Sequence, residues 1–308
     1  MSETFHHKTS WTALLSLLLV SSCISQNNPM TKETFLNIPY KKTGANSSLT
    51  SLDVYTPDSK GSFPVIVYVH GGAWEFGDKK YVSRKPDYFV SNGFVFVSIN
   101  HRLSPQVMHP EHAQDCADAI AWVYYHIREY GGDRDDIFLM GHSTGAHLVS
   151  LVSTDERYLK KSGLDLSIIR GTVSLDCDYY DIPFSLAQDE STRPLLEEVF
   201  GNNSSVWADA SPVNRIERNK GIPPFLLIYA ASGEGVTEVQ AERMRERLEV
   251  NSIHAKIYRA ENKTHSSLDK DIGEWYDEPT ERIMNFIISI LKPPLTAPFK
   301  MPVFFDSV

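Results

Sequence analysis

The chain has 308 residues and a net charge of −9, and 42% of its residues are hydrophobic. This length and composition suit one large globular domain with a sizeable core. The acidic balance and the lack of a Lys/Arg cluster argue against a nucleic-acid partner, because phosphate binding needs such clusters. The three cysteines, Cys23, Cys116 and Cys177, lack CxxC spacing, so neither a zinc site nor a redox pair is indicated. We expect Cys116 to be a small apolar residue on a helix.

Residues 1–22 have the features of a signal peptide. Lys8 precedes an apolar run over 11–20, and small residues follow it before Cys23. The run is too short to span a membrane as a helix, and its flanks are those of a secretory signal. The ending at Cys23 also resembles a lipoprotein box, which predicts an acylated cysteine that anchors the protein to a membrane surface. The alternative is an ordinary cleaved signal. Both predict export, to the cell envelope or to the medium.

Residues 24–36 are polar and are expected to form a tether; strand-like and helix-like segments alternate after them. One strand is predicted at 49–55, where apolar and polar residues alternate as in an exposed strand. Buried strands are predicted at 64–70, 94–100, 137–140, 171–175, 225–229 and 255–258. Helices are predicted at 81–91, 111–130, 146–152, 239–250 and 280–291. This alternation predicts an α/β domain over 37–292, with a mostly parallel sheet covered by helices on both faces.

Two segments interrupt the alternation. Residues 181–222 contain several prolines and one helix-like stretch near 195–200, and they predict an insertion that caps the site. Residues 293–308 are proline-rich and are expected to be extended.

Ser143 is the candidate nucleophile. It stands in Gly141-His142-Ser143-Thr144-Gly145, directly between a predicted strand and a predicted helix. This is the context of a nucleophile elbow, a turn so tight that its flanking residues must be small. The start of the helix favours the negative charge that develops there during reaction.

A glycine-rich segment at the end of an earlier buried strand is the candidate oxyanion hole. It has the sequence His70-Gly71-Gly72-Ala73-Trp74. Acyl transfer passes through a tetrahedral oxyanion that preorganised backbone N–H groups stabilise. We assign the donors to Gly72 and Ala73, together with the N–H of Thr144.

His265 is the candidate general base. It follows the last predicted strand, so we expect it in a loop at the same sheet edge as Ser143. The order of serine before histidine is that of this fold class. Of the competing histidines, His109 and His112 are expected to be solvated, and His147 is expected to be a hydrogen-bonded interior group.

The acid partner of His265 is the least determined of the candidate catalytic residues. It should leave the loop after strand 225–229, and that loop contains Glu234 but no aspartate. Glu234 is therefore assigned as the acid, and Asp176, which ends the preceding strand, is the alternative. Glu238, Asp178 or the absence of any acid remain open. The acidic cluster from Asp176 lacks the glycine and closing glutamate of a calcium loop, so no metal is expected.

Four motifs together resemble a known family. They are His70-Gly-Gly-Ala-Trp74, Asn100-His-Arg-Leu-Ser-Pro105, Tyr130-Gly-Gly-Asp133 and Gly141-His-Ser-Thr-Gly-Ala-His-Leu148. They resemble the α/β-hydrolase esterases related to hormone-sensitive lipase, most of all the group of feruloyl esterases, acetyl-xylan esterases and kynurenine formamidases. The resemblance covers about residues 50–290. Thr144 stands where this family usually has alanine, and Gly233 stands where it has the aspartate.

The resemblance implies hydrolysis of a small carboxylic ester without a cofactor. In the roles that it implies, Ser143 is the nucleophile, His265 is the base, and residues 71–73 with Thr144 form the oxyanion hole. Acetyl or aromatic acyl groups, including those on a polysaccharide, are the expected substrates. The rival hypotheses are a formamidase or other amidase, an acyltransferase, and a ligand-binding protein that has lost its acid.

Overall fold

The computed structural model describes residues 30–41, 47–232 and 235–291. In this part of the chain, eight strands form one sheet in the order β1-β2-β4-β3-β5-β6-β7-β8. The strands are β1 (Lys32–Pro39), β2 (Ser51–Pro57), β3 (Phe63–Val69), β4 (Val95–Ile99), β5 (Gly132–His142), β6 (Ile169–Leu175), β7 (Phe225–Ala230) and β8 (Ala255–Ala260). β2 is antiparallel to both of its neighbours, and all other pairs are parallel. The carboxyl ends of β3 to β8 therefore lie at one edge of the sheet.

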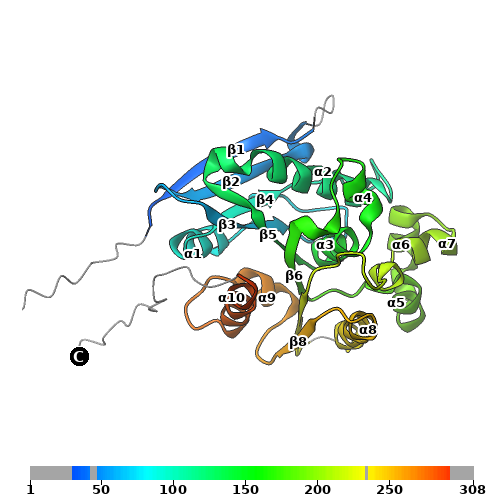
Figure 1. Cartoon of the computed structure of the whole chain (residues 1–308). Coiled ribbons are helices and arrows are strands. Elements are labelled where there is room, and N and C mark those ends of the chain that lie inside the picture. Colours follow the sequence, from blue (N-terminus) through cyan, green and yellow to red (C-terminus); the bar gives the residue numbers. More distant parts are fainter. Residues whose placement is uncertain (1–29, 42–46, 233–234, 292–308) are drawn as a thin grey trace, which may run out of the picture.

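Helices cover both faces of this sheet (Figure 1). They are α1 (Lys85–Ser91), α2 (Glu111–His126), α3 (Thr144–Thr154), α4 (Glu156–Lys160), α5 (Ile182–Gln188), α6 (Arg193–Phe200), α7 (Ser204–Asp209), α8 (Val236–Val250), α9 (His265–Lys270) and α10 (Glu278–Ile290). The helix predicted over 111–130 ends at His126 and continues as a 3-10 turn, which Gly131 closes with a φ of 77°. Across the described ranges, none of these helices has the length and apolarity needed to cross a membrane.

The two faces of the sheet carry separate hydrophobic cores because successive strand residues point to opposite sides. Val65, Val67 and Val69 of β3 belong to the core beneath α2 and α3. Ile66 and Tyr68 of the same strand belong to the core beneath α1, α9 and α10. A central strand buried on both faces is apolar along its whole length, as the sequence of β3 predicts.

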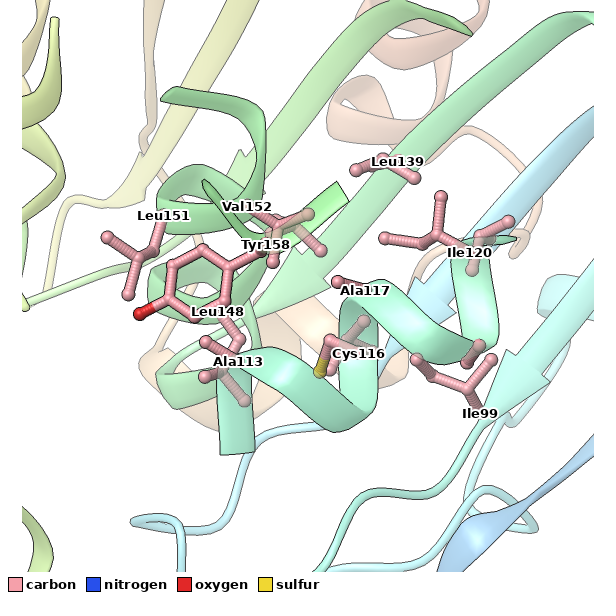
Figure 2. Packing of buried hydrophobic residues seen from close by; sticks show 14 of the residues in the cluster. Ile99, Ala113, Cys116, Ala117, Ile120, Leu139, Leu148, Leu151, Val152 and Tyr158 are labelled. Atoms are coloured by element: carbon pink, nitrogen blue, oxygen red, sulfur yellow. The ribbon is translucent and has the colours of Figure 1, made fainter. Parts of the chain in front are cut away.

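Small residues allow α2 to pack closely on the sheet and on α3 (Figure 2). Ala113, Cys116 and Ala117 of α2 lie toward Leu148 of α3, and all four are buried. Cys116 is a free thiol in this core, as expected for a small apolar helix residue. The packing fixes α3, and α3 begins directly after Ser143.

The structure corrects the expected tether at 24–36. β1 begins at Lys32 and pairs with β2 in antiparallel register, so residues 32–36 belong to the sheet. β1 is an edge strand with mostly exposed side chains, and its polar sequence therefore resembles that of a linker. The predicted signal peptide, Cys23 and residues 293–308 lie outside the described residues.

The strand predicted at 49–55 is also different from its expectation. β2 runs from Ser51 to Pro57 and is buried along its whole length instead of being half exposed. Its polar residue Asp53 does not face solvent, because it forms an ion pair of 2.5 Å with the buried Lys79. An alternating pattern does not distinguish a solvated aspartate from one with a buried partner.

The insertion between β6 and β7 is helical. α5, α6 and α7 lie within the range 181–222, and α6 occupies the stretch near 195–200 where a helix was predicted. Figure 1 shows these three helices grouped beside α3. The insertion therefore lies next to the helix that begins after Ser143.

Candidate active site

Ser143 occupies a strained turn between β5 and α3. Its φ and ψ are 56° and −122°, a conformation that non-glycine residues rarely adopt. Its N–H donates to the backbone oxygen of Leu175 on β6, at 2.8 Å. The flanking glycines are required by contact with backbone. A Cβ on Gly141 would lie 2.3 Å from the Gly145 oxygen, and one on Gly145 would lie 2.2 Å from the Val69 oxygen.

The segment after β3 lies directly against this turn. A Cβ on Gly71 would be 2.9 Å from the Cβ of Ser143. Three successive residues, Gly72, Ala73 and Trp74, have positive φ values of 128°, 54° and 59°. Turns in which successive residues leave the ordinary backbone regions can present their N–H groups to an anion. Among the described residues, no hydrogen bond uses the N–H of Gly72 or Ala73.

Thr144 joins this segment to the turn. Its hydroxyl oxygen accepts from the N–H of Trp74 at 3.4 Å. Its own N–H lies in the first turn of α3, where helix N–H groups have no partner within the helix. The structure thus brings together the three residues that the sequence assigned to an oxyanion hole.

His265 begins α9 instead of lying in a loop, which corrects that part of the prediction. Its Nδ1 lies 2.8 Å from Oδ2 of Asp176. The hydrogen bond to Asp176 is the main cause that raises the pKa of His265 above its ordinary value. The His265 side chain is half exposed, whereas Asp176 is almost completely buried. Within the described residues, no hydrogen bond joins Ser143 to His265.

The carboxylate that the structure places against His265 is therefore Asp176, the alternative to Glu234 in the sequence. Asp176 directly follows β6, with a φ of 53°, and its Oδ1 accepts from the N–H of Ala230 at 2.8 Å. The end of β7 thus holds one carboxylate oxygen, and the other faces His265. Glu234 lies outside the described residues. Glu238, also considered, accepts instead from the hydroxyl of Tyr229 at 2.9 Å.

Asp178, another carboxylate that was considered, lies close enough to influence the same site. Burial, followed by the charge of Asp176, raises the pKa of Asp178 to about 6. The signal in the sequence for Asp176 was its position immediately after a buried strand, together with the absence of an aspartate after β7.

The competing histidines are buried and neutral. Burial lowers the pKa of His147 to about 3 and those of His109 and His112 to about 4. His147 has its Nε2 bonded to the oxygen of Ala210 at 2.9 Å, which confirms it as an interior group. The expectation that His109 and His112 are solvated is wrong, because the side chain of His109 is 5% exposed and His112 is 1% exposed. Of the described histidines with a shifted pKa, only His265 has a raised one.

The helical insertion contacts the candidate oxyanion segment. Phe200 of α6 packs edge-on against Trp74, with ring centroids 5.1 Å apart, and against His147 at 5.9 Å. The insertion therefore packs against the segment that follows β3, and its role as a cap over the site stays a prediction. In the described ranges, no three His, Cys, Asp or Glu side chains are grouped so that they could hold a metal ion.

A mostly parallel eight-stranded sheet, a strained serine after β5 and a histidine–aspartate pair at the same edge define the α/β-hydrolase fold class. Within that class the assignment is more specific. Residues 52–248 match the family model described as BD-FAE, so the chain belongs to the BD-FAE family.

Several named proteins are similar in sequence. The probable carboxylic ester hydrolase LipM of Mycobacterium tuberculosis is 32% identical over 65% of this chain and 48% of its own length. Esterase LipC of the same organism is 31% identical over 60% and 48%. A probable isoprenylcysteine alpha-carbonyl methylesterase of Arabidopsis thaliana, ICMEL1, is 29% identical over 70% and 48%. The chain thus spans about half the length of these relatives.

Solved structures share the fold at lower identity. A truncated carbohydrate esterase from gut microbiota superimposes with a TM-score of 0.69 at 19% identity, over 85% of this chain and 96% of that one. Esterase B from Lactobacillus rhamnosis gives a TM-score of 0.67 at 20% identity, over 86% of each chain. These similarities confirm the fold class predicted from the sequence.

Proposed function

We propose that this protein is a serine esterase that hydrolyses small carboxylic esters through an acyl-enzyme. The observation that carries the proposal is the hydrogen bond between His265 and Asp176, at the sheet edge where the strained Ser143 stands. Asp176 holds Nδ1 of His265 protonated, which leaves Nε2 free to accept a proton from the Ser143 hydroxyl. The names of the sequence relatives support ester cleavage.

The reaction proceeds in two steps, acylation of Ser143 and hydrolysis of the acyl-enzyme. The Ser143 oxygen bonds to the ester carbonyl carbon while its proton passes to Nε2 of His265. The N–H groups of Gly72, Ala73 and Thr144 stabilise the oxyanion, and each such donor typically contributes about 3 kcal/mol. The intermediate collapses, and the alcohol leaves with the proton from His265. Water then attacks the acyl-enzyme by the same route and releases the carboxylic acid.

A fluorophosphonate probe with p-nitrophenyl acetate hydrolysis tests this proposal. Wild-type protein is expected to hydrolyse the ester and to carry the probe on Ser143, and Ser143→Ala is expected to do neither. Folded protein that is not labelled at Ser143 would overturn the proposal in favour of a binding protein. A faster rate on N-formyl substrates than on acetyl esters would indicate a formamidase, and acyl transfer to added alcohol in preference to water would indicate a transferase.

For the acyl group, we propose acetyl or aromatic acyl esters on a polysaccharide. The support is a likeness of fold to a carbohydrate esterase from gut microbiota and to a bifunctional GH43-CE of Bacteroides eggerthii. Release of acetate or ferulate from xylan, compared with release from a p-nitrophenyl ester, tests this proposal. Hydrolysis of the small ester alone would contradict it.

We also propose export and a lipid anchor at Cys23, on the sequence of residues 1–23. Metabolic labelling with an alkyne fatty acid is expected to mark the wild type and not Cys23→Ser. An unlabelled wild type in the medium would support the ordinary cleaved signal instead.

A further inference from the structure

The imidazole of His142, the residue before Ser143, contacts the backbone of His265. Nε2 of His142 lies 2.8 Å from the oxygen of His265, and the two ring centroids are 4.5 Å apart. A carbonyl oxygen can only accept, so Nε2 of His142 carries the proton and donates it. His142 is 8% exposed, whereas the side chain of His265 is 49% exposed. A buried ring at the end of β5 thus holds the first residue of α9.

Asp269 anchors the same short helix one turn further on. The hydroxyl of Tyr68 donates to its Oδ1 at 2.5 Å, and Nζ of Lys85 lies 2.8 Å from that oxygen. The Lys85 ammonium also donates to the backbone oxygen of Asp269 at 2.7 Å, and its side chain has no exposed surface. Tyr68 belongs to β3 and Lys85 to α1, so both ends of α9 are fixed to the sheet and its helical layer.

The charge of His142 is compatible with a supporting role. Burial lowers the pKa of His142 to about 4, so the ring is neutral near pH 7. This neutrality matters because acyl transfer leaves His265 transiently as an imidazolium. A second positive ring at 4.5 Å would oppose that charge, whereas a neutral N–H donor does not.

We propose that His142 is a positioning residue for His265. The N–H of His142 holds the backbone of His265 and thereby keeps its imidazole against Asp176, while Asp269 anchors the rest of α9. This inference rests on the proposed esterase function. The contact fixes the backbone directly behind the reacting ring. Without it, no hydrogen bond from β5 holds the first residue of α9, and the helix keeps its capping residue Thr264, the buried Leu268 and the anchor at Asp269. A displacement of about 1 Å at a reacting group lowers turnover by about 100-fold.

Two substitutions at His142 isolate the hydrogen bond in the full-length protein. His142→Phe keeps a ring but removes the donor. His142→Gln restores an N–H group three bonds from Cβ, which is where histidine has its Nε2. His254→Phe, an exposed position just before β8, is the matched control. The His265 imidazole is titrated by NMR, with its signal assigned by His265→Asn, and kcat and KM are measured beside it.

For His142→Phe, we expect a lower pKa of His265, because its hydrogen bond to Asp176 loosens, and a kcat reduced by about 10–100-fold with little change in KM. We expect His142→Gln to recover both values and His254→Phe to match the wild type. A folded His142→Phe with unchanged titration and kcat would overturn the proposal.

If His142→Phe does not fold, His142→Asn replaces it, since its shorter amide does not reach the carbonyl. Equal His265 titration in His142→Asn and His142→Gln would then overturn the proposal. The NMR titration of His265 does not require the protein to be enzymatically active. An inactive wild type with an unlabelled Ser143 therefore refutes the esterase function separately.

Discussion

Replacement of Asp176 by asparagine is the sharpest test of the active-site geometry. One oxygen of Asp176 accepts from the Ala230 N–H and the other faces Nδ1 of His265. In Asp176→Asn, the Ala230 N–H keeps the amide oxygen on its side, so the amide nitrogen faces His265. That nitrogen is a donor, which requires Nδ1 to be an acceptor and places the proton on Nε2. An imidazole protonated at Nε2 cannot take the proton of Ser143.

The expected effect is large. The same exchange in another serine hydrolase triad lowers kcat by about 10⁴-fold without disturbing the geometry. This factor corresponds to about 5.5 kcal/mol of lost transition-state stabilisation. The assay compares kcat for p-nitrophenyl acetate and the rate of fluorophosphonate labelling at pH 7. Circular dichroism and thermal unfolding of the variant establish that the fold is retained.

Glu234→Gln is the control, since the sequence alone favoured Glu234 as the acid. It is expected to retain most of its kcat, because Asp176 already supplies the carboxylate at Nδ1 of His265. Strong inactivation by Glu234→Gln, with a nearly normal Asp176→Asn, would refute the assignment of the acid and the geometry on which it rests.

Three further predictions concern pH and stability. The pKa of His265 is raised above 6.5, and His265 must be neutral to act as the base. We therefore expect kcat/KM to rise with pH through a midpoint above 6.5. A pH–rate profile with a lower midpoint would contradict this prediction. Gly145→Ala would place a Cβ 2.2 Å from the oxygen of Val69. We therefore expect the free energy of unfolding, measured in urea, to fall by about 3 kcal/mol. An unchanged value would refute the steric reasoning. Lys85→Met leaves the Asp269 carboxylate without its cation, and we expect the free energy of unfolding to fall by about 3 kcal/mol. The double variant Lys85→Met/Asp269→Asn is expected to restore part of this loss. Equal stability of Lys85→Met and the wild type would contradict a structural ion pair.

The sequence predicted the central sheet and the nucleophile well, because these depend on local patterns. β3 and β7 are continuous apolar runs, and the two glycines that flank Ser143 have no substitute in a turn that touches backbone. Gly72, Ala73 and Thr144 could be assigned because a glycine-rich turn after a buried strand, with an elbow further along the chain, is the local pattern of an oxyanion hole.

The features that were missed depend on distant partners. The sequence favoured Glu234 over Asp176, and only the approach of Ala230 and His265 points to Asp176. His112 is polar in sequence but is satisfied in the interior by the hydroxyl of Ser104, at 3.1 Å. The residues of β1 are mostly exposed, and it is the pairing with β2 that identifies them as a strand.

The hydrogen bond from the Ser143 N–H to Leu175, the residue before Asp176, has a consequence for local unfolding. It places the nucleophile and the acid in one cooperative unit, the paired strands β5 and β6, whereas the base arrives on a helix near the end of the described chain. Opening of residues 261–291 would therefore remove the base while the rest of the sheet remains paired. Loss of hydrolysis at low denaturant is then a reporter of the docking of the last helices and precedes the melting of the sheet.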